Sequence, residues 1–175
     1  MAKTIKLKDD VYFDSSAIMH NKELLKTILD KLLEVNSMTV GLNTNTNFTI
    51  STAWNYQPIP LDKLRVNTGS RLKFENNGIK IPAGVKRVRV SGNGMLCGIV
   101  GQQILLLTHN STTISTGYAH PPGTGNWSVI SLSPITIDVN EGDMIYLKYG
   151  AGSTGTLRIA GGMYTYLTVD VVELE

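Results

Sequence analysis

The densest group of side chains able to bind a ligand lies in the segment "THNSTTISTGYAHPPGTGNW", residues 108–127. Carbohydrate sites commonly combine an aromatic ring, which faces the apolar side of a sugar, with amide and hydroxyl groups that bind its hydroxyls. We therefore select Tyr118, His120, Asn126 and Trp127 as candidate ligand-binding residues. A Pro-Pro pair in the same segment would stiffen it and lower the ordering cost of binding. For Trp127 a second interpretation stays open, because it begins a predicted strand and suits the core equally well.

Residue types that perform catalysis or hold metals are present, but not at the spacings that such sites require. His20, His109 and His120 are far apart, and none has a second metal ligand at helical or hairpin spacing. The 14 acidic residues lie mostly in turns and at the two ends, so no carboxylate pair indicates glycoside cleavage. "GNG" (92–94) and "GAGSTG" (150–155) lack the following helix of a phosphate-binding loop and are interpreted as turns. We expect a protein that is not an enzyme and holds no metal or cofactor.

Cysteine content, charge and hydropathy exclude further classes. The single cysteine, Cys97, rules out an intramolecular disulfide, and its apolar context "GMLCGIV" predicts a buried, inert thiol. A net charge of +2 is too mild to indicate a nucleic-acid partner. No window approaches the roughly 20 apolar residues of a membrane span, and the N-terminus lacks the apolar core of a signal peptide. We expect synthesis in the cytoplasm, without membrane insertion.

The N-terminal region contains the one helical pattern in the sequence. The first twelve or so residues alternate and predict a short strand, after which the period changes within residues 15–35. There an apolar seam repeats every seven residues and consists of Leu25, Ile28, Leu32 and Val35. Two interpretations are open: the apolar seam packs on the domain's own sheet, or it packs against copies of itself as a short parallel bundle.

From residue 38 onward the sequence consists of short β-type runs separated by Gly, Asn and Pro turns. This pattern predicts a mostly β protein, with a two-sheet jelly roll of about eight to ten strands. We therefore divide the chain into residues 1–37, a short strand and one α-helix, and residues 38–175, a jelly-roll β-sandwich head.

Alternation within the strands predicts which side chains face the core. In "MIYLKYG" the predicted core face consists of Ile145, Leu147 and Tyr149. In "MYTYLTVDVVEL" it consists of Met163, Thr165, Leu167, Val169 and Val171. The opposite face of this last strand carries Tyr164 and Tyr166, which are typical either of a subunit interface or of ordinary cross-strand aromatic pairs. Trp54 and Tyr56 form a second patch, for which we expect packing against the helix or a neighbouring head.

The segment "GIKIPAGVKRVRVSGN" places basic residues within a strand-like run. Alternation puts Val88 and Val90 on the core side, while Val85, Arg87 and Arg89 share the other face. The two arginines are therefore expected to point outward, toward solvent or a sister subunit.

This segment, the later "ITIDVNEGDMIYLKYGAGSTGTLRI" and the closing "TYLTVDVVEL" together resemble a trimeric jelly-roll family. It has the fold of tumour necrosis factor and of the complement-type globular head, here in the form found in phage virion proteins. In that family an "IPxxG" turn leads into a central strand, a "V..GD.I.L" hairpin comes late and a "TYL" strand closes the fold. The order and spacing agree over residues 70–175.

The N-terminal "KTIKLKDDVYFDSSAIMHNKELLKTIL" resembles the leader of small tail or baseplate structural proteins in phages and prophages of Gram-positive bacteria. Together the two resemblances imply a homotrimer in a virion, attached to other virion proteins through its N-terminal segment. The head would bind a host receptor, such as a cell-wall glycan or surface polymer. The alternative is a purely structural head fibre, collar or capsid appendage. The implied trimer contacts are Leu25, Ile28, Leu32, Val35, Tyr164 and Tyr166.

Overall fold

The structure, a computed structural model, describes residues 5–6, 12–13, 36–69 and 71–174. The chain divides into two compact units, residues 1–35 and residues 36–175. In the first unit, where one strand was expected, β1 (Ile5–Lys6) pairs antiparallel with β2 (Tyr12–Phe13). The predicted helix lies outside the described residues, as do its seam residues Leu25, Ile28, Leu32 and Val35.

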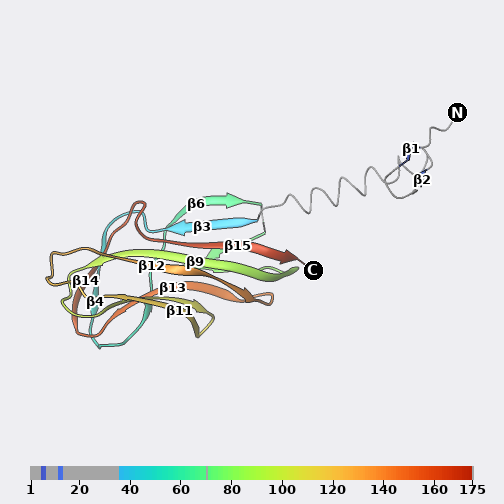
Figure 1. The fold of residues 1–175 in the computed structure, drawn as a ribbon. Coiled ribbons are helices and arrows are strands. Elements are labelled where there is room, and N and C mark those ends of the chain that lie inside the picture. The colour runs from blue at the N-terminus through green and yellow to red at the C-terminus, as the bar shows by residue number, and fades with distance from the viewer. Residues whose placement is uncertain (1–4, 7–11, 14–35, 70, 175) are drawn as a thin grey trace. The chain divides into compact units, whose positions relative to one another are not determined.

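The second unit is a sandwich of two antiparallel sheets (Figure 1). The seven-stranded sheet contains β12 (Ser128–Asp138), β9 (Val85–Cys97), β15 (Tyr166–Leu174), β3 (Ser37–Gly41), β6 (Lys63–Thr68), β14 (Gly155–Ile159) and β4 (Thr46–Ile50). The six-stranded sheet contains β11 (Thr112–Ala119), β10 (Gln103–His109), β13 (Met144–Ala151), β8 (Gly78–Lys80), β7 (Lys73–Glu75) and β5 (Gln57–Pro58). The described part of this unit therefore has more strands than predicted, because several short ones extend the sheet edges.

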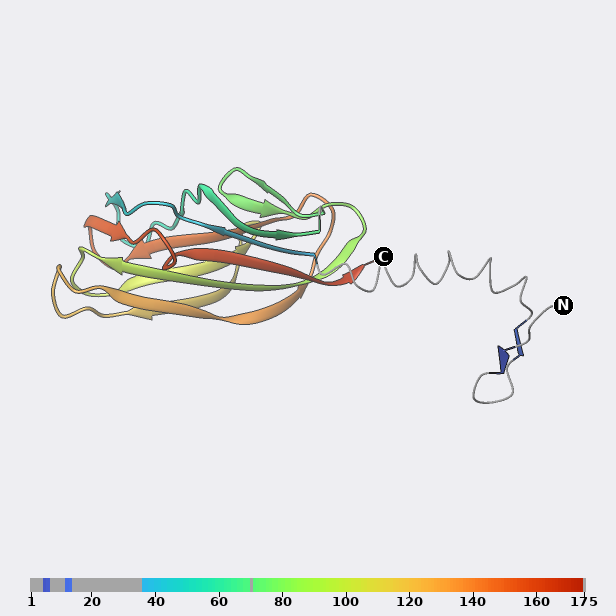
Figure 2. The same cartoon turned by 90° about the horizontal axis from the view of Figure 1, so that it is seen from above.

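The longest strand, β9, organises the seven-stranded sheet. It pairs with β12 along one edge and with β15 and β14 along the other, and Figure 2 shows β15 running beside it. The prediction that "GNG" forms a turn is wrong, since Gly92 and Gly94 lie inside β9. A Cβ on Gly92 would lie 2.9 Å from Leu147 Cδ1, and one on Gly94 would lie 3.0 Å from Leu105 Cδ1. Leucines of the facing sheet fill the space that the glycines leave.

Most predicted core positions are confirmed. In β13, Ile145, Leu147 and Tyr149 are buried. At the start of the last strand Thr165, Leu167 and Val169 are buried as well. Val171 is partly buried and packs against the core. Met163 is exposed at 80%, because it lies in the turn before β15.

The outward orientation of the two arginines in β9 is also confirmed. Val88 and Val90 are fully buried, whereas Arg87 and Arg89 are exposed. Val85, which was expected on the arginine face, is buried. The register between β9 and β15 shifts at this end of the strands, and the shift breaks the alternation.

The two ends of the sandwich hold different parts of the chain. At one end, which we call the proximal end, the unit begins at Asn36, whose carbonyl accepts from the Val171 amide over 2.7 Å, and β15 ends there. At the opposite end, which we call the distal end, residues 120–127 connect β11 to β12. The Trp54 amide also donates there, over 2.9 Å, to the carbonyl of Ala151 at the end of β13.

Candidate binding surfaces

The four ligand-binding candidates of the sequence divide between the two sheets. Tyr118 lies on β11 of the six-stranded sheet and is 63% exposed, and His120 is exposed just after it. Asn126 and Trp127 are neighbours before β12, with Asn126 exposed and Trp127 half-buried. The Arg158 guanidinium of β14 lies 5.7 Å from the centroid of the Trp127 ring. Trp127 therefore packs along the seven-stranded sheet, whereas Tyr118 belongs to the other sheet.

The outer face of the six-stranded sheet brings Tyr118 together with an aromatic residue that is distant in sequence. Strand register places Tyr118, Ile104 and Gly150 in one row across β11, β10 and β13. The row continues beyond β13, because Tyr56 immediately precedes the β5–β13 pairing. A Cβ on Gly150 would lie 2.6 Å from Tyr56 Cδ1, so the Tyr56 ring covers this glycine.

Trp54 occupies a similar position just beyond the end of β13. A Cβ on Gly152 would lie 3.1 Å from Cζ2 and Cη2 of Trp54, so this ring covers a glycine as well. Trp54 has a φ of 66°, a conformation that bulky L-residues rarely adopt. The rings remain open on their other side, since Trp54 is 52% and Tyr56 38% exposed. We call Trp54, Tyr56 and Tyr118 the distal aromatic patch.

A lysine lies beside this patch. Register places Lys148 on the outer face one pleat from the patch row, between Leu106 of β10 and Pro58 of β5. Its ammonium is 5.9 Å from the centroid of the Tyr146 ring, a distance compatible with a cation–π contact. Among the described residues, no acidic side chain lies within ion-pair distance of it. Within the described part of the chain, Lys148 is thus a half-buried cation that forms no ion pair.

The outer face of the seven-stranded sheet carries the two tyrosines selected from the sequence. Tyr164 is 55% exposed and Tyr166 is half-buried. Register places Val129 beside Met95 on the same face, and Val129 is exposed too. We call Met95, Val129, Tyr164 and Tyr166 the tyrosine face. The side-chain amide of Asn93 in β9 donates a hydrogen bond to the Tyr164 carbonyl, which ties the segment before β15 to the sheet.

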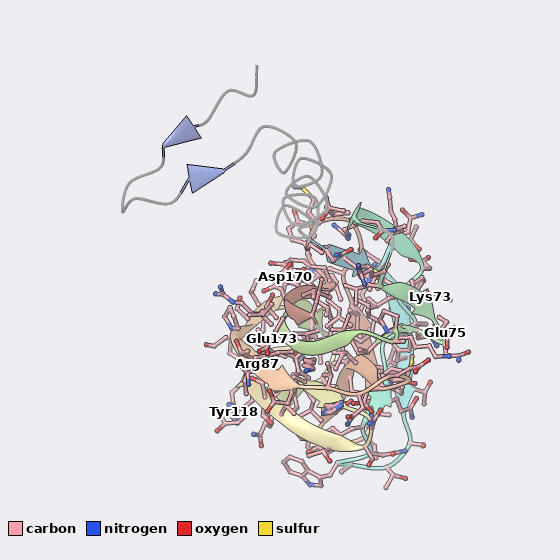
Figure 3. The ribbon with its side chains drawn as sticks, turned by 90° about the vertical axis from the view of Figure 1, so that its right-hand side faces the viewer. Lys73, Glu75, Arg87, Tyr118, Asp170 and Glu173 are labelled. Carbon is pink, nitrogen blue, oxygen red and sulfur yellow. The ribbon has the colours of Figure 1, made fainter. Side chains whose placement is uncertain are left out.

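Several polar groups elsewhere on this outer face bind one another. The hydroxyls of Thr39 and Thr168 lie 2.9 Å apart on neighbouring strands. Nearer the proximal end, Arg87 Nε donates to Asp138 over 2.7 Å, and its Nη1 lies 3.1 Å from a carboxylate oxygen of Glu173. Figure 3 shows Arg87 and Glu173 side by side. The hydrogen-bonded ladder contrasts with the apolar groups of the tyrosine face.

A compact ionic cluster connects two turns at the proximal end. His109 Nε2 lies 2.6 Å from one Asp143 carboxylate oxygen, which also accepts from the Asn140 amide over 2.8 Å. The second oxygen accepts from Asn110 Nδ2 over 2.8 Å. Burial acts to raise the pKa of the Asp143 carboxyl, but the hydrogen bonds from Asn110, Asn140 and His109 outweigh it and lower the pKa. The cluster therefore contains an ionised carboxylate, and both of its oxygens already accept hydrogen bonds.

The remaining features support no reactive centre in the described part of the chain. Burial raises the pKa of the Cys97 thiol, although the charge of Arg158 acts the other way, and the predicted buried position is confirmed. No group of three His, Cys, Asp or Glu side chains among the described residues is placed to hold a metal ion. Among the residues that the structure describes, no helix is long and apolar enough to cross a membrane.

A groove of about 610 Å³ lies at the β7–β8 edge of the six-stranded sheet, where Figure 3 labels Lys73 and Glu75. The Lys80 ammonium is paired with the Glu75 carboxylate at 2.9 Å, so opposite charges neutralise each other within it. The groove and Tyr118 lie at opposite edges of the sheet (Figure 3).

Sequence reasoning assigned Trp54 and Tyr56 to packing and missed Lys148. One signal was present. The aromatic pair in "WNY" and the glycine pair in "GAG" have the same two-residue spacing, and antiparallel pairing places each ring over a glycine. Aromatic side chains commonly cover strand glycines in this way. The sequence alone does not show that these two segments pair with each other.

Solved structures of tumour necrosis factor-type and complement-type heads share this fold. Murine APRIL at pH 8.0 matches with a TM-score of 0.60 and 8% identity, over 79% of this chain and 99% of that chain. The Eiger TNF of S. frugiperda matches with a TM-score of 0.62 and 9% identity, over 81% and 95%. The globular domain of zebrafish complement 1qA matches with a TM-score of 0.56 and 10% identity, over 80% and 99%.

No protein-family model matches the chain, and no curated protein matches its sequence significantly. At identities this low, the likeness to solved structures concerns the fold alone. The fold resemblance found in the sequence is confirmed: residues 36–174 form a jelly roll of the tumour necrosis factor and complement-head type.

Proposed function

We propose that this protein is a non-enzymatic, homotrimeric head of a phage virion, of tail-fibre or baseplate type, that contacts the host surface. The jelly-roll fold supports the assignment as a head domain. The resemblance of the sequence to a trimeric virion family supports the proposed trimeric assembly and the proposed location in a virion. The N-terminal resemblance supports attachment to other virion proteins through residues 1–37. The protein acts by binding and assembly, without catalysis.

The exposed tyrosine face is the main observation that supports the proposed trimer. Val129 and Tyr164 are more than half exposed, whereas several polar groups elsewhere on the same sheet face are hydrogen-bonded to one another in pairs. Aromatic residues and Met are enriched at the centre of subunit interfaces, and polar groups form their rim. Burying this face between sister heads would remove exposed apolar surface from water without breaking the polar ladder.

The position of Asn36 supports the distal end as the free end of the proposed trimer. Asn36 begins the sandwich at the proximal end, so a virion partner held by residues 1–37 leaves the distal end open. Three weak contacts presented together exceed a single contact by about two to four powers of ten in affinity. Avidity is therefore the proposed mechanism of host attachment.

Two measurements test this function. Mass spectrometry of purified phage particles from a strain that carries the gene should detect this chain, and its absence would contradict the virion assignment. Excess purified protein should then block adsorption of the same phage to its host. The purely structural alternative, a head fibre, collar or capsid appendage, instead predicts that the chain is present in particles but does not affect adsorption.

A further inference from the structure

The distal aromatic patch has the features of a ligand surface and lies apart from the tyrosine face. Its three rings belong to the outer face of the six-stranded sheet, and each is between 38% and 63% exposed. Two of them are fixed against glycines, so little side-chain entropy remains to be lost when a ligand covers them. A planar apolar surface of this kind matches the apolar face of a sugar ring.

The spacing of the rings suits a chain of sugars. Tyr118 lies on β11 and the Tyr56 ring covers Gly150 on β13, which is two strand spacings away, or about 10 Å. This is the scale of a disaccharide. Trp54 covers Gly152, two residues further along the chain and just beyond the end of β13, or about 7 Å away. The three rings therefore mark positions for successive units of a polymer.

Charge indicates which kind of polymer. Lys148 lies two residues from Gly150 on the same outer face, about 7 Å away, and no described acidic side chain is within ion-pair distance of it. Its side chain is half-buried, and its ammonium lies 5.9 Å from the centroid of the Tyr146 ring on the same outer face. A carboxylate or phosphate on a bound sugar chain would supply the missing counter-charge.

The apolar residues beneath the patch argue against a protein partner. Ile104 and Leu106 lie on the outer face, since Leu105 and Leu107 are the β10 residues in the core, yet both are buried by their neighbours. A protein hot spot needs an apolar centre that the partner can desolvate, whereas this face offers separate rings, with Thr116 and Lys148 in the next row.

We infer that the distal aromatic patch binds an acidic polysaccharide, with sugar rings on Trp54, Tyr56 and Tyr118 and an anionic group at Lys148. The site lies at the free end of the head, opposite the point where the chain enters the sandwich. This inference deepens the host-binding role proposed above and rests on it for the biological source of the polymer. The binding chemistry itself is independent of the trimer.

The test uses the purified full chain and surfaces coated with hyaluronan, polygalacturonate, polysialic acid or wall teichoic acid. Dextran and chitin serve as neutral surfaces. We expect binding to at least one acidic polymer and weaker binding at high salt. Tyr118→Ala and Lys148→Gln should each weaken it about tenfold, and Lys148→Gln should also reduce the salt dependence. Leu64→Ala is the control, because Leu64 is 48% exposed on β6 of the other sheet and belongs neither to the patch nor to the tyrosine face.

The outcomes separate this site from the proposed function. A folded trimer that binds none of the acidic polymers would overturn the inference and leave the trimer intact. Equal binding by the wild type, Tyr118→Ala and Lys148→Gln would also overturn it. A monomer that binds through Tyr118 and Lys148 would confirm the site but contradict the trimeric head. Circular dichroism of each variant verifies the fold, and both substituted side chains lie outside the core.

Discussion

Replacing Asp143 by alanine should destabilise the jelly roll substantially. The carboxylate receives three hydrogen bonds, from His109, from Asn110 Nδ2 and from the Asn140 amide, and its side chain is only 14% exposed. These bonds connect the turn after β10 to the turn before β13. Their loss would release both turns and leave three donors to be satisfied by water.

The expected size follows from these contacts. Hydrogen bonds to charged groups contribute about 1.5–3 kcal/mol each, and partial replacement by water reduces the sum to about 3 kcal/mol. For a domain of this size, that loss lowers the melting temperature by about 10 °C. Asp62→Ala is the control, since the exposed Asp62 carboxylate accepts one backbone hydrogen bond, from the Asn43 amide over 2.7 Å. We expect it to cost about 1 kcal/mol or less.

The effect should depend on pH in a defined direction. The pKa of Asp143 is lowered in the folded state, so the unfolded state takes up a proton first as the pH falls. The stabilisation is complete above the unfolded carboxyl pKa of about 3.9 and is lost as the pH falls through the lower folded pKa. The melting temperature of the wild type should therefore exceed that of Asp143→Ala by a constant difference near neutral pH, and this difference should shrink below about pH 4.

Thermal unfolding followed by circular dichroism measures both effects. Melting temperatures of the wild type, Asp143→Ala and Asp62→Ala would be compared between acidic and neutral pH. An Asp143→Ala variant that melts within about 2 °C of the wild type at neutral pH would refute the reasoning. A difference in melting temperature that grows as the pH falls would also refute it.

Three further predictions concern the core and the patch. Leu105→Ala removes a fully buried side chain between the sheets and should lower the free energy of unfolding by about 2–5 kcal/mol, as measured by urea denaturation. Gly150→Val should displace the Tyr56 ring, because even a Cβ there would lie 2.6 Å from Cδ1, and an unchanged near-ultraviolet dichroism spectrum would contradict this. The buried Cys97 thiol, whose pKa burial raises, should react with a thiol reagent only after unfolding; rapid reaction of the folded protein would show that it is accessible.

Alternation alone predicted the core of the fold, because a strand at a sandwich interface must bury every second side chain. Val88, Val90 and Leu147 are examples, and all three are fully buried. The same reasoning failed for Gly92 and Gly94, which carry a turn signal locally but lie inside a strand. Their role depends on leucines of the facing sheet, so only the tertiary structure reveals it.

The candidate sites were predictable to a smaller degree. The exposure of Tyr164, just before β15, agrees with the predicted alternation, whereas the grouping of Tyr118 with Trp127 relied on sequence proximity. The two flank a loop that passes from one sheet to the other, so nearness in the chain does not place them on one surface. The partners of Tyr118 on its sheet face, Tyr56 and Trp54, come from a segment more than sixty residues earlier.

The trimer is the central claim, and the mass of the intact assembly tests it most directly. Native mass spectrometry of the full chain at micromolar concentration should give three times the 19.1 kDa of one chain. Tyr166→Lys should shift the population toward monomer, because it places a charge on the tyrosine face, while the circular dichroism spectrum should be unchanged. A wild-type protein that remains monomeric at this concentration would contradict the account.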